Sequence, residues 1–154
     1  MKTVDIYTDG ACSGNPGKGG YGVVMLYGSA RKELSEGFSR TTNNRMEVLA
    51  VITGLASLKE SCNVNLYSDS KYVVNAIEQG WLEGWKKNGW KKSNKGAVLN
   101  VDLWKKLDEQ RKKHNVKFIW VKGHAENVEN ERCDQLAREA ASGINLSTDE
   151  EYKG

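Results

Sequence analysis

The sequence has one proline, few cysteines and no long apolar run. None of its apolar stretches approaches the roughly 20 residues that a membrane-spanning helix needs. Its first residues lack the apolar core and the cleavage site of a signal peptide. The three cysteines, Cys12, Cys62 and Cys133, are odd in number and form no C-x-x-C pair. These absences argue against a membrane protein, a disulfide framework and a cysteine zinc site, and they favour a reducing cytoplasm.

Length and composition predict one globular domain. The chain has 154 residues, of which 38% are hydrophobic and 28% charged, a balance that argues against wholesale disorder. A chain of this size buries about two-thirds of its unfolded surface. We expect a domain over residues 1–143, a polar tail over 144–154 that frays from Thr148 onward, and no assembly beyond a monomer.

Periodicity and turn residues predict an α/β fold. Strands are expected at 3–9, about 20–27 and about 31–40, with a glycine-rich turn over residues 10–22 between the first two. Helices are expected at about 44–58, 70–79, 81–87 and 101–113, strands at 63–68 and 116–121, and, after a loop over 123–128, a last helix that ends near residue 143. This order implies a five-stranded mixed sheet, three antiparallel strands and then two parallel ones, flanked by helices.

A short internal similarity places two aspartates at matching points. Residues 4–10 read Val-Asp-Ile-Tyr-Thr-Asp-Gly, and residues 64–70 read Val-Asn-Leu-Tyr-Ser-Asp-Ser. If these strands lie side by side and parallel, as a right-handed crossover places them, Asp9 and Asp69 project from the same end of the sheet. Ligands usually bind at that end. The alternative is that both are turn or cap residues.

Two further acids stand in unusual positions. Glu47 is the only charged residue over positions 46–58, in a helix that is apolar almost all round, so its carboxylate needs a partner or a bound cation. Asn44-x-x-Glu47 also fits a helix capping box, and the segment alone does not separate the two interpretations. Asp134 lies at the margin of the buried stripe of the last helix, where an ion pair with Arg138 is the alternative.

Gathered carboxylates predict a metal site. Two like charges about 4 Å apart repel by roughly 4 kcal/mol at an effective dielectric constant of about 20. Four such groups therefore raise their own pKa values or recruit a divalent cation. A donor set made only of oxygen favours Mg²⁺ or Mn²⁺ over zinc, and a pair of such ions can serve both oxygens of a phosphodiester displacement. We expect metal-assisted hydrolysis by water.

Five motifs, taken in order, resemble those of bacterial type 1 ribonuclease H. They are YTDGACSGNPG at 7–17, TNNRME at 42–47, YSDS at 67–70, WVKGH at 120–124 and NERCD at 130–134, and the resemblance extends from about Val4 to Ala141. It implies the ribonuclease H-like fold and endonucleolytic cleavage of the RNA strand of an RNA–DNA hybrid. It also implies two Mg²⁺ ions per active site with substrate, and products with 3′-hydroxyl and 5′-phosphate ends. The residues that match the family's catalytic positions are Asp9, Glu47, Asp69 and Asp134, and His124, which would assist proton transfer or product release.

The same resemblance implies a set of substrate contacts. Cys12, Ser13 and Asn15 match residues that line the RNA-strand minor groove, where 2′-hydroxyls distinguish RNA. Asn43 and Asn44 match residues that touch both strands, whereas Arg40, Thr42 and Asn100 match a pocket for a DNA-strand phosphate. We expect one of Thr42, Asn43 and Asn44 to cap the following helix as well.

A basic stretch between Gly80 and Gly96 contains five lysines and three tryptophans. It corresponds to a protrusion that grips the DNA strand in the family, with Trp81, Trp85, Lys86 and Lys87 as the expected contacts. The alternative for such a charge run is an ordinary solvated surface.

Two positions depart from the family pattern. Lys71 stands where glutamine is frequent, and it is expected either to add a substrate contact or to attract the local phosphate. Glu126 adds a negative charge beside His124, in a loop where glycine and proline are common. The rival functions are a structure-selective DNA endonuclease or integrase-like nuclease on the same fold, and a module that binds hybrids without cutting them. The presence of all four acids argues against the last of these.

Overall fold

A five-stranded mixed sheet organises the molecule. The computed structural model describes residues 1–92, 96–122 and 127–152. The strands are β1 (Thr3–Gly14), β2 (Gly17–Tyr27), β3 (Ala30–Thr41), β4 (Asn63–Ser68) and β5 (Asn115–Trp120). Their order in the sheet is β3-β2-β1-β4-β5, with β1, β2 and β3 antiparallel and β4 and β5 parallel to β1. The predicted fold class is confirmed.

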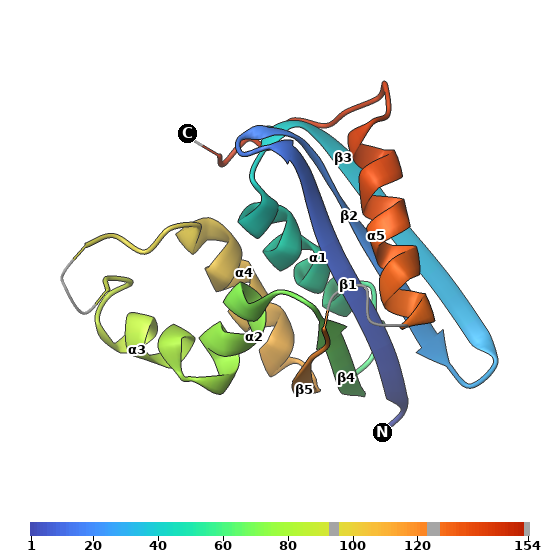
Figure 1. Cartoon of the computed structure of the whole chain (residues 1–154). Coiled ribbons are helices and arrows are strands. Elements are labelled where there is room, and N and C mark those ends of the chain that lie inside the picture. The colour runs from blue at the N-terminus through green and yellow to red at the C-terminus, as the bar shows by residue number, and fades with distance from the viewer. Residues whose placement is uncertain (93–95, 123–126, 153–154) are drawn as a thin grey trace.

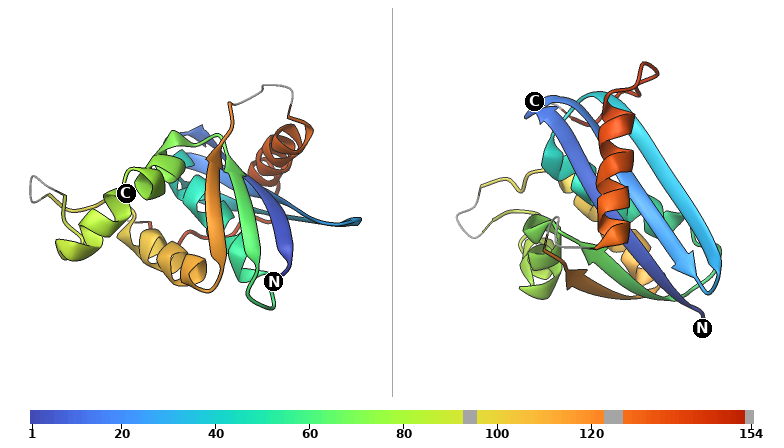
Figure 2. Two further views of the ribbon diagram at one scale, coloured as in Figure 1. Left: turned by 90° about the horizontal axis from the view of Figure 1, so that it is seen from below. Right: turned by 45° about the vertical axis from the view of Figure 1, so that its right-hand side comes forward.

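Helices cover both faces of this sheet. They are α1 (Asn43–Ala56), α2 (Lys71–Glu78), α3 (Trp81–Lys87), α4 (Val101–Lys112) and α5 (Val128–Ala141). Figures 1 and 2 show α1 and α4 on one side of the long strands and α5 on the other. Alternate residues of the strands accordingly face different helices, since Ile6 and Val23 belong to the core around α1 and Val24 packs with Cys133 of α5.

The β1–β2 hairpin is longer than the sequence suggests. The expected turn over residues 10–22 is wrong, because β1 continues to Gly14 and pairs with β2 from Gly17 onward. Glycine serves close packing here: a Cβ on Gly10 would lie 2.6 Å from the backbone nitrogen of Glu47, and one on Gly22 would lie 2.3 Å from the carbonyl oxygen of Cys133. These glycines let α1 and α5 approach the strands at backbone distance.

Helix α1 is buried almost all round, as predicted. Its buried residues include Met46, Val48, Val51 and Leu55, together with two charged residues, Arg45 and Glu47. A buried charge is costly unless it is paired, so both side chains require partners in the tertiary structure.

The C-terminal segment is docked against the body of the protein. Ser147 pairs with β3 through backbone hydrogen bonds, from Ser39 N to its oxygen at 2.9 Å and from its nitrogen to Gly37 O at 2.8 Å. Asp149 lies against the guanidinium of Arg45, with 2.7 Å between its carboxylate and Nε. The expected fraying from Thr148 is therefore wrong for the described part of this segment, since its acid neutralises a buried cation of α1.

Within the described residues, no helix has both the length and the apolar character that crossing a membrane requires.

Candidate metal centre and its surroundings

Asp9 and Asp69 meet where the parallel pairing of β1 with β4 ends, with Asp9 inside β1 and Asp69 just after β4. Strands β1 and β4 pair in the register that the internal similarity predicts, with Val4 beside Val64 and Thr8 beside Ser68. The rings of Tyr7 and Tyr67, which precede the two acids by two residues, stack with their centroids 4.5 Å apart. Asp69 follows β4 directly, so the predicted juxtaposition of the two acids is confirmed.

Glu47 reaches the same point from α1. Thr42 is the N-cap of that helix and accepts a hydrogen bond from Arg45 N at 3.3 Å, so Glu47 lies in the second turn and the capping-box interpretation is wrong. The backbone N–H of Gly10 donates to both Glu47 Oε1 and Asp9 Oδ1. Because Gly10 has no side chain, the backbone of β1 at this residue can pack directly against the turn of α1 that carries Glu47.

These three acids form an oxygen-only cluster. One carboxylate oxygen from each of Asp9, Glu47 and Asp69 lies within 4.8 Å of the others. Asp9 is 5% exposed and Glu47 is 4% exposed. Burial and then the charge of Asp69 raise the pKa of Asp9 to about 8, and burial and then the charge of Asp9 raise the pKa of Glu47 well above its ordinary value. Carboxylates held this close fit a hard divalent cation, which relieves their repulsion.

Asp134 borders the same hollow from α5. The hollow has a volume of about 450 Å³, and its lining includes all four acids: Asp9, Gly10, Asn43, Asn44, Glu47, Asp69, Ser70, Lys71, Tyr72 and Asp134. Asp134 is not part of the tight cluster, and its carboxylate accepts a hydrogen bond from Arg138 Nε at 2.9 Å. The sequence analysis treated the ion pair with Arg138 and a place beside the other acids as alternatives for Asp134. Asp134 has both.

The raised pKa of Asp9 predicts a pH-dependent stability in the absence of metal. The unfolded chain loses this proton near pH 3.8, whereas the folded protein keeps it to about pH 8, so the free energy of unfolding should fall as the pH rises between these values. The test is urea unfolding of Asp9→Asn and of the parent with a chelator present. We expect the gain in free energy of unfolding from the substitution to be larger at pH 8 than at about pH 5.5, by roughly 2–3 kcal/mol. An equal difference at both pH values would contradict this.

The hairpin turn contacts the start of α1. Asn15 Oδ1 accepts a hydrogen bond from the backbone nitrogen of Asn43 at 3.1 Å. Ser13 lies near the end of β1, and the thiol of Cys12 points to backbone oxygens, at 3.4 Å from Thr41 O. Thr42, Asn43 and Asn44 then begin the helix, and the two asparagines line the acidic hollow. Asn43 and Asn44 therefore border the acids directly, whereas Cys12 and Ser13 line a separate hollow beside α5, and Asn15 connects the hairpin turn to Asn43.

Arg40, Thr42 and Asn100 lie around a buried arginine that the sequence analysis did not single out. Arg45 is 2% exposed, and its guanidinium contacts Asn100 Oδ1 at 3.3 Å. Asn100 in turn donates to the hydroxyl of Tyr72, which lines the acidic hollow. The sequence did hold a signal for the importance of Arg45, because it is a charged residue two positions before Glu47 in the same apolar helix.

The basic stretch divides into core and surface. Trp85 packs edge-on against the buried Trp104 at 5.5 Å between centroids, whereas Trp81 is 40% exposed. Lys86 pairs with Asp108 at 3.0 Å, and Lys87 is exposed. Trp81 and Lys87 are therefore the members of the expected set that this structure presents to a ligand most openly.

Lys71 stands at the rim of the acidic hollow. Its ammonium lies 5.2 Å from the centroid of the Trp120 ring, and Trp120 Nε1 donates to the backbone oxygen of Asp69 at 3.2 Å. The predictions for His124 and Glu126 fall on positions outside the described residues.

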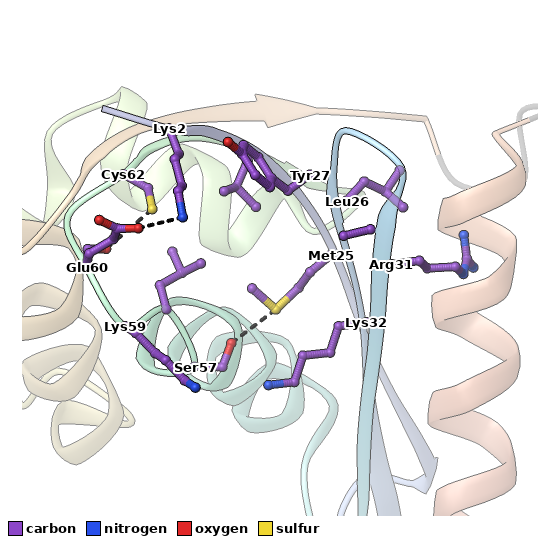
Figure 3. Close-up of a pocket in the computed structure, with 13 residues that line it drawn as sticks. Lys2, Met25, Leu26, Tyr27, Arg31, Lys32, Ser57, Lys59, Glu60 and Cys62 are labelled. Atoms are coloured by element: carbon purple, nitrogen blue, oxygen red, sulfur yellow. Dashed lines mark hydrogen bonds and ion pairs between the residues drawn. The ribbon is translucent and has the colours of Figure 1, made fainter.

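A second hollow, of about 320 Å³, lies at the opposite end of α1 (Figure 3). Its lining is mainly apolar, and Met25, Leu58 and Cys62 contribute to it. Glu60 is the only acid among its described lining residues, and it pairs with Lys2 at 2.8 Å. Its lining residues therefore contain no cluster of carboxylates like that of Asp9, Glu47 and Asp69.

Comparison with known proteins gives one consistent family. The sequence model described as RNase H matches residues 1–142. A curated relative named ribonuclease H, from Desulforamulus reducens, is 64% identical over 149 residues, which cover 97% of this chain and 94% of the relative.

Solved structures agree with these sequence matches. LC9-RNase H1, described as a type 1 RNase H with the type 2 active-site motif, is 32% identical with a TM-score of 0.84, covering 96% of this chain and 75% of that one. LC11-RNase H1, solved in complex with an RNA/DNA hybrid, is 23% identical with a TM-score of 0.65, covering 90% of this chain and 96% of that one, and at this identity it supports the fold alone.

Proposed function

This chain belongs to the ribonuclease H family, and from that membership we propose that it is an endoribonuclease that hydrolyses the RNA strand of RNA–DNA hybrids. The observation that carries the proposal is the cluster of Asp9, Glu47 and Asp69, in which three carboxylate oxygens lie within 4.8 Å of one another. We propose that residues 1–143 form the catalytic domain of a cytoplasmic monomer, and that residues 144–154 follow this domain as a C-terminal tail that packs back on it.

We propose that Asp9, Glu47, Asp69 and Asp134 hold two Mg²⁺ ions when substrate is bound, with Mn²⁺ as a possible substitute. Bound there, the ions would supply Lewis-acid polarisation of the phosphodiester and help to deprotonate a water. Burial of Asp9 and Glu47 keeps competing solvent from the carboxylates, and Gly10 N orients both of them. His124 is proposed to assist proton transfer.

We propose that water attacks the phosphorus and that the 3′ oxygen is the group that leaves, which gives 3′-hydroxyl and 5′-phosphate ends. The new P–O bond forms as the bond to the 3′ oxygen breaks, so the oxygen of the water remains on a 5′-phosphate. The 3′ oxygen takes up a proton and leaves as a hydroxyl. No covalent intermediate with the protein is required, because water is the nucleophile and the carboxylates serve to hold the metal ions.

We propose a set of substrate contacts, of which Asn43, Asn44 and Lys71 line the acidic hollow. Cys12, Ser13 and Asn15 would read the RNA-strand minor groove, and Asn43 and Asn44 both strands. Arg40, Thr42 and Asn100 would hold a DNA-strand phosphate. The remaining proposed contacts are Lys71, Trp81, Trp85, Lys86 and Lys87. The hydrogen bond from Asn43 N to Asn15 supports a single continuous surface, because it ties the hairpin turn to α1.

A cleavage assay on four labelled substrates tests this function. In Mg²⁺, the RNA strand of an RNA–DNA hybrid should be cut internally, while single-stranded RNA, double-stranded RNA and double-stranded DNA of the same sequence should stay intact. Chelation of the metal should stop the reaction. Cleavage of DNA would favour a DNA endonuclease on this fold, and binding of the hybrid without any cleavage would favour a binding module.

A further inference from the structure

The C-terminal segment, residues 147–152, returns to the N-terminal end of α1, beside the proposed substrate surface (Figure 1). We propose that this segment is a working part of the substrate site, in which Asp149 and Tyr152 are positioning residues for Arg45 and Arg40. The ligand is a backbone phosphate of the DNA strand. The inference rests on the proposed function for the identity of the duplex, and on the geometry below for the role of the segment.

Asp149 clamps the first turns of α1. Its Oδ2 accepts hydrogen bonds from Arg45 Nε and Thr41 Oγ1, both at 2.7 Å, and its Oδ1 accepts one from Arg45 Nη2 at 3.0 Å. Its side chain is 10% exposed. Thr41 ends β3 and Arg45 lies in α1, so one carboxylate fixes the strand end and the helix start to each other.

The clamp continues to the acidic hollow. Arg45 Nη1 donates to Asn100 Oδ1 at 3.3 Å, and Asn100 Nδ2 donates to the hydroxyl of Tyr72 at 3.1 Å. Tyr72 lines the hollow together with Asp9 and Asp69. Hence a continuous chain of hydrogen bonds runs from the C-terminal segment, through a buried guanidinium, to the wall of the proposed catalytic centre.

Tyr152 acts on a second cation. The guanidinium carbons of Arg40 and Arg45 each lie 5.9 Å from the centroid of its ring, within the range of cation–π attraction. Arg45 is already neutralised by Asp102 and Asp149, both at 2.7 Å, so it has little charge left for a ligand. Arg40 is exposed and two residues from the Thr42 cap. The ring therefore holds the cation that faces solvent at the place where a phosphate would approach α1.

Binding of an uncut hybrid, measured in chelator over a range of salt concentrations, tests the role of Tyr152. Tyr152→Ala should raise the dissociation constant by about 3-fold or more and make the slope of log K against log salt shallower by up to about 0.9, the value of one lost phosphate contact. Tyr152→Phe keeps the ring and should behave as the parent does. In an Arg40→Ala background, Tyr152→Ala should have no further effect, because both changes remove the same contact.

Asp149 is tested against a neighbour with the same charge. Asp149→Asn should raise KM for hybrid cleavage about 3-fold or more with kcat kept within about 2-fold, whereas Glu150→Gln, which removes one charge from an exposed position, should leave KM within about 2-fold. Circular dichroism at the assay temperature ensures that folded molecules are compared. A loss of thermal stability without any change in KM would assign the segment a structural role only and overturn the inference.

Two other outcomes would also decide. Tighter binding by Tyr152→Ala would make the acidic segment a competitor of phosphate and overturn the positioning role. If the parent leaves the RNA strand of the hybrid uncut in Mg²⁺, the proposed function fails by itself. A salt slope that depends on Tyr152 with either duplex would still support the phosphate contact, and its absence with both would refute it.

Discussion

Asp9→Asn is expected to lower the single-turnover rate of hybrid cleavage by about 10³-fold or more, with the fold retained. The amide has the size of the carboxylate but lacks its charge, so the cluster with Glu47 and Asp69 loses affinity for a divalent cation. Cleavage is measured with enzyme in excess over labelled hybrid in saturating Mg²⁺. Because repulsion within the cluster is also relieved, the inactive variant should be the more stable protein in chelator at pH 8.

The matched control is Asp5→Asn on the same strand. Asp5 accepts a hydrogen bond from Asn65 Nδ2 at 3.1 Å and lies four residues before Asp9, away from the cluster. It undergoes the same chemical change, and cleavage by this variant should stay within about 3-fold of the parent. Activity of Asp9→Asn above about a tenth of the parent's would remove Asp9 from the metal chemistry.

Gly22→Ala is expected to destabilise the fold by about 3 kcal/mol or more, enough to be measured readily in urea unfolding. A Cβ on Gly22 would lie 2.3 Å from the carbonyl oxygen of Cys133 and 2.8 Å from the Cβ of Leu136. The first of these atoms belongs to the backbone of α5, so a rotamer change cannot relieve the contact and the whole helix must move away from β2. Since α5 carries Asp134, cleavage should fall together with stability.

Gly84→Ala provides the same substitution where space is open. Nothing lies within 4 Å of a Cβ at Gly84, which is inside α3, so this variant should be equally stable or more stable by up to about 1 kcal/mol. A Gly22→Ala protein with the unfolding midpoint of the parent would mean that α5 does not sit on β2 at this distance.

Part of the geometry of the proposed catalytic site could be predicted from local sequence patterns. The similarity of residues 4–10 and 64–70 placed the two aspartates at matching positions, provided that the two strands pair in parallel, and the observed register matches Val4 with Val64. Two equal patterns of alternation place equal positions on the same face of a sheet, which is why Asp9 and Asp69 coincide. The burial of α1 also followed from its composition, which is apolar on nearly every side.

Local pattern failed where a residue's partner lies far away in the chain. Asn44 and Glu47 have the spacing of a capping box, but Thr42 caps the helix and Glu47 turns to Gly10 instead. The glycines of β1 and β2 suggested a turn because local preference says nothing of a helix that packs on them. The polar residues around Asp149 suggested a frayed end, because the partner of Asp149, Arg45, lies 104 residues away in the chain and local pattern does not show it.

The sequence by itself indicated the five-stranded mixed sheet, the matching positions of Asp9 and Asp69 on two strands, and the family to which the chain belongs. These depend on periodicity and motif, which each segment carries independently of the others. Only the tertiary structure decided that Glu47 reaches the cluster from the second turn of α1, and that Arg45 ties the C-terminal segment to Asn100 and Tyr72. A buried charge takes whichever partner the packed chain brings to it, and that choice is made by all the segments together.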